Sequence, residues 1–163
     1  MLDNPNRVSK VLVFEIDGRR FGLNSDTVHE ILPMVTVSPM PGAPAFVEGV
    51  ISIRGRVTLV LDLRSQLGLL ARGPLHTDHL IVARAGESLV GLHVDRAVEL
   101  IQLQDDDIEA PKGVKSCGGY VGWLAKCSDQ LVPVLDLRTL PALGESKPPE
   151  ELLCHSELDG SHP

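Results

Sequence analysis

The sequence predicts an all-β protein built from two lobes that are copies of one unit. Two observations carry this prediction. The run Val-Leu-Asp-Leu-Arg at residues 60–64 returns letter for letter at 134–138, and residues 21–30 align without a gap on residues 90–99. Around these matches, short β-rich runs alternate with turn residues, which is typical of barrels or sandwiches and not of a parallel sheet. A duplicated β unit therefore explains the chain better than an array of short repeats, which needs three or more units.

The first half of the chain is expected to contain five strands. Two of them form a hairpin across the Asp-Gly turn at residues 17–18, because such a dipeptide between apolar runs is a strong hairpin signal. Prolines at 33, 39, 41 and 44 predict an extended loop after the third strand, since proline donates no hydrogen bond to a sheet. The glycine at 68 ends a short helical turn. The expected strands cover residues 11–16, 21–23, 28–32, 49–53 and 56–62.

The second half is expected to repeat this plan after a small and polar linker at residues 71–78. We expect one domain over residues 9–144, with lobes at approximately 14–70 and 78–142 and an N-terminal strand able to cross over to the second lobe. The termini, 1–8 and 145–163, are expected to be flexible or partly helical, with a helical turn or two at 150–154. The strands expected here cover residues 80–83, 89–94, 97–103, 120–125 and 131–136.

Length, charge and cysteine content limit what the chain can be. Lobes of about 60–70 residues are too small to be stable alone, so the two should share a core. A net charge of −7 and an aromatic content of 3% argue against binding to nucleic acid or to an anionic membrane. The apolar runs are strand-sized, no secretory leader pattern is present, and the three cysteines show no metal or disulfide spacing. We therefore expect a cytoplasmic protein with reduced thiols and no membrane insertion.

The duplicated aspartates are the most conspicuous carboxylates. Asp62 and Asp136 each end an apolar strand immediately before a Leu-Arg turn. A capping role, in which the carboxylate accepts backbone N–H groups of the turn, explains them better than catalysis. Duplication strengthens this interpretation because a structural cap is needed in both copies, whereas an active site seldom is.

The histidines and glycines do not predict an enzyme. The pair His76 and His79 lies in the linker and is expected to be solvated, whereas His29 and His93 stand in strands as packing or surface residues. No nucleophile elbow, phosphate-binding loop or metal-binding helix motif is present. We therefore expect no enzymatic activity, no catalytic residues, no cofactor and no metal.

Two charged residues are open to more than one interpretation. Arg54 precedes Gly55 between two apolar strands, as in a turn that requires positive φ. Its guanidinium suits two roles equally well: bonding the carbonyl groups of the turn, or pairing with the carboxylate of a partner. Glu30 stands in an otherwise apolar strand, where its simplest role is that of a solvent-facing residue.

Several of these segments together resemble the CheW-like family of chemotaxis coupling proteins. The strongest part is Gly-Val-Ile-Ser-Ile-Arg-Gly at residues 49–55, followed by the Val-Leu-Asp-Leu-Arg run that ends at Arg64. The resemblance covers roughly residues 9–142 with the motifs in the order of the family. It is also carried by residues 28–31, 44–48, 57–63 and 90–96.

The resemblance implies two five-stranded Src-homology-3-like β-barrel lobes packed together, with short helices at the lobe ends and no catalysis. Members of the family are adaptors that hold the cytoplasmic tip of a methyl-accepting chemoreceptor and the regulatory domain of the histidine kinase CheA, and are recruited to membrane receptor arrays. By position, Val28 and Glu30 match the receptor-contacting strand, and Arg54 matches the arginine beside the receptor groove. Val90, on the facing lobe, would help to wall that groove.

Two other functions stay open on the sequence alone. A coupling protein of a chemosensory-like pathway that controls pili or a second messenger would carry the same motifs. A small β-barrel ligand-binding protein or hydrolase would need histidines and carboxylates to converge in the seam between the lobes. We expect no such convergence.

Overall fold

A computed structural model describes residues 10–109 and 121–139. These residues form eleven strands and three short 3-10 helices. The expected termini, the helical turn at 150–154, and Cys117 and Cys154 lie outside them. The strands are β1 (Lys10–Ile16), β2 (Arg19–Asn24), β3 (Val28–Pro33), β4 (Val47–Ile53), β5 (Arg56–Leu61), β6 (His79–Ala85), β7 (Ser88–Val94), β8 (Arg96–Gln102), β9 (Ile108–Glu109), β10 (Val121–Cys127) and β11 (Gln130–Leu135), and the 3-10 helices are η1 (Ser25–Thr27), η2 (Asp105–Asp107) and η3 (Leu137–Thr139).

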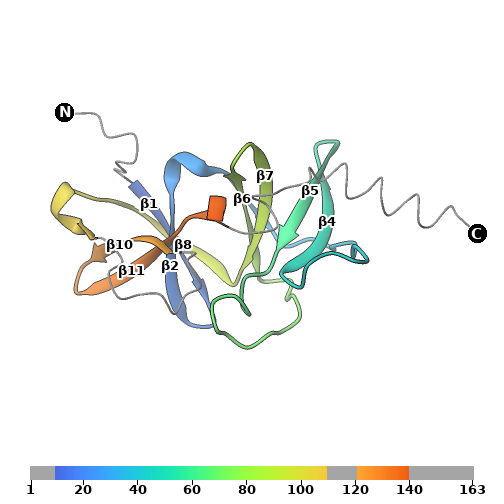
Figure 1. Cartoon of the computed structure of the whole chain (residues 1–163), viewed down its shortest axis with the longest axis horizontal. Helices are drawn as coiled ribbons and strands as arrows, with labels where there is room; N and C mark the ends of the chain where they lie inside the picture. Colours follow the sequence, from blue (N-terminus) through green and yellow to red (C-terminus); the bar gives the residue numbers. More distant parts are fainter. Residues whose placement is uncertain (1–9, 110–120, 140–163) are drawn as a thin grey trace, which may run out of the picture.

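The strands form two sheets that lie side by side along the long axis of the molecule (Figure 1). Sheet A has the order β8-β1-β2-β11-β10-β9, and sheet B has the order β3-β6-β7-β5-β4. Each sheet contains one parallel pair, β2 with β11 and β5 with β7, between antiparallel neighbours. The first five strands of sheet A, β8-β1-β2-β11-β10, correspond one by one to the strands of sheet B, β3-β6-β7-β5-β4, as members of the two copies of the unit. The all-β class and the internal duplication are therefore confirmed.

The two sheets do not coincide with the two halves of the sequence. The β6–β7 hairpin follows the linker but pairs with β3 and β5 of the first half. The β1–β2 hairpin pairs with β8 and β11 of the second half. The strands of sheet B therefore lie within residues 28–94, and the described strands of sheet A lie within residues 10–24 and 96–135, whereas the expected lobes covered 14–70 and 78–142. Each copy of the unit donates its first hairpin to the sheet of the other copy, which extends the expected crossover to both lobes.

Sheet A has one strand more than the five expected. The additional strand, β9, is two residues long and pairs with Leu124 and Ala125 of β10. It follows the 3-10 helix η2, where Asp107 Oδ2 accepts the backbone N–H of Gln104 at 2.9 Å. That contact belongs to the capping box at the start of η2.

Side chains from both sheets share the largest core. Phe14 and Leu23 from sheet A pack in one cluster with Leu61 and Leu92 from sheet B. Two smaller clusters lie one on each sheet, around Val13 and Val134 in sheet A and around Val60 and Leu80 in sheet B. Alternation along each strand explains this arrangement, because successive side chains point to opposite faces. The shared cluster supplies the core that lobes of this size require.

The β4–β5 hairpin shows how local sequence sets geometry near the candidate site. Arg54 and Gly55 both adopt positive φ, at 50° and 81°, which is the two-residue turn that matches the twist of the flanking strands. At the other end of β4, Gly49 lies where the preceding loop crosses the strand. A Cβ atom there would lie 2.2 Å from the carbonyl oxygen of Ser38, so this crossing requires glycine.

Candidate interaction surface and buried polar network

Glu30 and Arg54 meet at the edges of sheet B. Glu30 is on β3, and Arg54 is in the turn that follows β4; β3 and β4 are the two opposite edges of the sheet. The guanidinium donates to both carboxylate oxygens, with Nη2 at 2.9 Å from Oε1. The side chain of Arg54 is 70% exposed and that of Glu30 is 20% exposed. Hydrogen bonding to Arg54 lowers the pKa of Glu30, and the same bond raises the pKa of Arg54.

This pairing differs from one of the two roles considered for Arg54. In the free chain the guanidinium bonds Glu30 of the same chain and not the carbonyl groups of its own turn, and pairing with a partner stays a prediction. Glu30 therefore has a partner and is more than a solvent-facing residue. The bidentate geometry fixes the direction of both side chains and leaves the charged pair at the surface.

The two valines predicted beside the groove differ in exposure. Val28 lies at the start of β3, is half-buried, and packs against the shared core. Val90 is fully buried on β7, at 0% exposure, and lines the same core as Leu92. The expectation that Val90 walls a surface groove is therefore wrong. Alternation puts Val90 and Leu92 on the face of β7 that packs against sheet A.

Both duplicated aspartates make the contact that a cap requires. Asp62 Oδ1 accepts the backbone N–H of Arg64 at 3.1 Å, and Asp136 Oδ1 accepts that of Arg138 at 3.0 Å. Hydrogen bonds from Arg138 lower the pKa of Asp136. The two turns thus have the same local structure, which explains why the Asp-Leu-Arg run occurs twice.

A buried histidine lies between two carboxylates on sheet B. His93 is 0% exposed, with Nδ1 at 2.8 Å from Glu48 Oε1 and Nε2 at 2.7 Å from Asp78 Oδ2. Burial alone would lower the pKa of His93, but the hydrogen bonds to Glu48 and Asp78 outweigh it and raise the pKa. A ring with acceptors at both nitrogens is stabilised in its doubly protonated form.

Asp78 connects this histidine to a wider network. It is 2% exposed and accepts two hydrogen bonds from Arg72, both at 2.9 Å. Arg72 also donates to Asp95 at 2.6 Å, and Arg64, which is 1% exposed, donates to the same Asp95 oxygen. The second oxygen of Asp95 accepts the backbone N–H of Asp17 at 2.8 Å, in the β1–β2 turn. The network therefore ties the linker to both sheets.

These contacts overturn two expectations. Histidine and carboxylates do converge in the folded chain, and Asp78, in the segment expected to be a solvated linker, is almost completely buried. The sequence of β7 contained a signal for the buried histidine, because His93 stands among apolar residues in that strand. Nothing near Asp78 in the sequence indicated its burial. Its partner His93 is distant in the sequence, and its partners Arg72 and Leu75 come within reach only when the linker folds.

Three members of this region could hold a cation. Glu48, Asp62 and His93 each offer one ligand atom, and these atoms all lie within 4.8 Å of one another. The side chains of Glu48 and Asp62 are 17% and 21% exposed, so the cluster has access to solvent.

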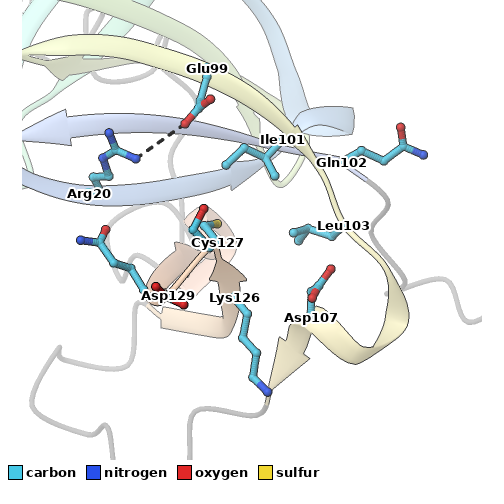
Figure 2. Close-up of a pocket in the computed structure, with 11 residues that line it drawn as sticks. Arg20, Glu99, Ile101, Gln102, Leu103, Asp107, Lys126, Cys127 and Asp129 are labelled. Carbon is cyan, nitrogen blue, oxygen red and sulfur yellow. Dashed lines mark ion pairs between the residues drawn. The ribbon is translucent and has the colours of Figure 1, made fainter.

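An open hollow of about 900 Å³ lies at one end of sheet A (Figure 2). Its wall mixes both signs of charge, including Lys126, Asp129 and an ion pair of 3.6 Å between Arg20 and Glu99. Cys127 lines it, but burial raises the pKa of the thiol, which disfavours the reactive thiolate. This hollow has no arrangement that indicates chemistry.

Comparison with known proteins decides the family. A model of the CheW-like domain matches residues 10–145. The chain belongs to the CheW-like family. A chemotaxis protein CheW of Rhizobium meliloti is 34% identical over 107 residues, which cover 66% of this chain and 69% of that protein. The chemotaxis protein CheW of Thermotoga maritima is 29% identical over 128 residues, covering 78% and 84%.

A solved structure supports the same assignment. The scaffolding protein TtCheW of Thermoanaerobacter tengcongensis matches with a TM-score of 0.73 and 29% identity, over 79% of this chain and 89% of that one. As a member of the CheW-like family, the chain is a non-enzymatic chemotaxis coupling adaptor. Among the described residues, no helix is long and apolar enough to cross a membrane.

Proposed function

We propose that the surface around Glu30 and Arg54 binds the cytoplasmic tip of a methyl-accepting chemoreceptor, while other surfaces bind the regulatory domain of a CheA-type histidine kinase. Through these partners the adaptor would be recruited to membrane receptor arrays. The observation that supports this proposal is the exposed bidentate pair of Glu30 and Arg54. Two apolar side chains near these residues in the sequence are exposed: Ile31, which follows Glu30, at 42%, and Val57, three residues after Arg54, at 37%.

Such a surface suits recognition of a helical hairpin. An amphipathic helix binds through an apolar stripe, and polar groups at the margin fix its register. Exposed apolar side chains of β3 and β5 offer the first kind of contact, and Arg54 offers the second. A carboxylate of the receptor would share or replace Glu30 as the partner of Arg54, and a bidentate guanidinium discriminates sharply between correct and shifted positions.

The test is co-elution of three purified components: the full chain, the receptor tip fragment and the kinase regulatory domain. Arg54→Ala and Glu30→Lys should weaken binding of the receptor tip by about ten-fold or more, because each leaves an interfacial charge without its partner. Binding of the kinase domain should not change. Arg84→Ala is the matched control, since Arg84 is an exposed arginine on β6 of the same sheet.

Two outcomes would contradict the proposal. Unchanged receptor binding in both variants would show that the receptor docks elsewhere. Loss of the cooperative unfolding transition in Arg54→Ala would show that the pair serves folding and not recognition. If the wild-type chain bound neither partner, the adaptor would serve a different chemosensory pathway.

A further inference from the structure

We propose that Glu48, Asp62 and His93 form a binding site for a divalent transition-metal ion of the zinc class, in addition to the role of the chain as an adaptor. The site lies on the face of sheet B that carries Val60 and Leu80, beyond the end of that small core. It is separate from the Glu30–Arg54 pair, which involves the turn at the opposite end of β5.

Three adjacent strands bring the donor atoms together. β4, β5 and β7 are neighbours in sheet B, and Asp62 and His93 each follow one residue after the paired residues Leu61 and Leu92. Glu48 lies in the β-bulge between Val47 and Gly49, a distortion that redirects a side chain relative to regular pairing. One imidazole nitrogen and two carboxylate oxygens therefore lie within 4.8 Å of one another.

These separations suit a zinc ion after a small adjustment. Ligand distances of about 2.1 Å in a tetrahedral site set separations of about 3.4 Å between the donor atoms. Rotation of Glu48 and Asp62, whose side chains are partly exposed, closes the remaining gap. Their exposure also leaves the fourth position open to water and gives the ion a path of entry.

His93 is already oriented as a metal ligand would be. Its Nε2 lies 2.7 Å from Asp78, and Asp78 is in turn held by both terminal nitrogens of Arg72. A carboxylate on the far nitrogen of the ring is the usual support of a histidine that binds a metal, because it fixes the tautomer and the ring direction. Nδ1 is then left for the ion, which would take the place of the proton now shared with Glu48 and release that proton to solvent.

The charge around the site also favours a dication. Three carboxylates, from Asp62, Asp78 and Asp95, contact the guanidinium groups of Arg64 and Arg72, and a fourth, from Glu48, contacts His93. With His93 neutral, the cluster carries a net charge of −2, which one divalent ion balances. An imidazole ligand selects zinc, nickel or copper over magnesium and calcium, which prefer oxygen ligands alone.

The experiment is titration of the full chain, without a polyhistidine tag, with Zn²⁺ by calorimetry, after removal of metals by a chelator. We expect saturable binding of one ion per chain at this site, and no competition from an excess of Mg²⁺. Glu48→Gln and Asp62→Asn should each weaken binding by about ten-fold or more. Asn at 62 retains an oxygen that can accept the N–H of Arg64, so this variant should fold.

Two controls separate this site from the other histidines and cysteines. His29→Gln removes an exposed histidine on β3 and should leave binding unchanged. A variant with Cys154→Ser, His155→Gln and His162→Gln should also retain binding. Absence of Zn²⁺ binding by the wild-type chain, full binding by Glu48→Gln and Asp62→Asn, or loss of binding in the C-terminal variant would each overturn the proposal.

Discussion

Replacing Asp78 by asparagine should destabilise the protein more than any surface substitution. The change keeps the shape of the side chain but removes its charge. Asp78 accepts two hydrogen bonds from Arg72 at 2.9 Å, one from the backbone N–H of Leu75 at 2.8 Å, and one from His93 Nε2 at 2.7 Å. Asparagine has one acceptor oxygen, so its NH₂ group must face at least one of these donors.

The size of the effect follows from the burial of the partners. Removing one member of a buried ion pair typically costs about 3–5 kcal/mol. His93 is fully buried and cannot regain water, whereas the side chain of Arg72 is 31% exposed and can. We therefore expect the lower end of the range, a loss of about 3 kcal/mol in the free energy of unfolding. For a chain of this length, that loss lowers the Tm by about 6–12 °C.

Urea unfolding followed by circular dichroism, with a chelator present, measures this difference. The matched control is Asp129→Asn, an exposed aspartate in the turn between β10 and β11, which should change stability little. A loss below about 1 kcal/mol in Asp78→Asn would refute the reasoning, because a value that small is typical of a solvated carboxylate.

The same comparison has a pH dependence of known sign. Burial would raise the pKa of Asp78, but hydrogen bonds from Arg72 and His93 outweigh it and hold the pKa well below its usual range. A carboxyl whose pKa is lower in the folded state stabilises the protein above its unfolded pKa, about 3.9, and loses that contribution as the pH falls towards the folded value. The difference between the wild type and Asp78→Asn should therefore narrow below about pH 4. A constant difference from pH 6 to pH 3 would contradict this account.

Three further substitutions test other parts of the structure by urea unfolding. Gly49→Ala should cost about 1–3 kcal/mol, because the new Cβ would lie 2.2 Å from the carbonyl oxygen of Ser38; Gly73→Ala, where the Cβ meets nothing within 4 Å, is the control. Asp62→Ala should cost about 0.5–2 kcal/mol through the lost cap, and an unchanged midpoint would disprove the capping role. Val90→Ala should lower stability without changing receptor-tip affinity, since Val90 is buried, and a binding defect in a fully folded variant would contradict that assignment.

Local pattern predicted the strands well because strand alternation and turn chemistry are encoded within a few residues. The turn at Arg54 and Gly55 and the cap at Asp62 are of this kind. Alternation along β7 also indicates that Val90 shares a face with Leu92 and is buried, whereas position within the family indicated a groove wall. For Val90, strand alternation predicted the observed burial and position within the family did not.

Partners that meet only in the folded chain were not predictable in this way. His93 is 45 residues from Glu48 and 15 from Asp78 in the sequence, and no periodicity relates them. The pairing of Glu30 with Arg54 depends on two opposite sheet edges approaching each other. Exchange of the first hairpins between the copies follows from pairing between distant strands, which the duplicated motifs do not specify.

This exchange has a consequence for the order in which the protein folds during synthesis. Sheet B is complete once the ribosome has produced β7, since its strands lie in one continuous stretch from Val28 to Val94. The β1–β2 hairpin is made first but waits longer for its partners. Its β1 strand pairs with β8, which follows sheet B, and its β2 strand pairs with β11, where Val134 lies near the other end of the domain. Until β11 is made, the β2 edge of this hairpin has no partner strand, and a nascent chain of this kind offers that edge to chaperones or to a second copy.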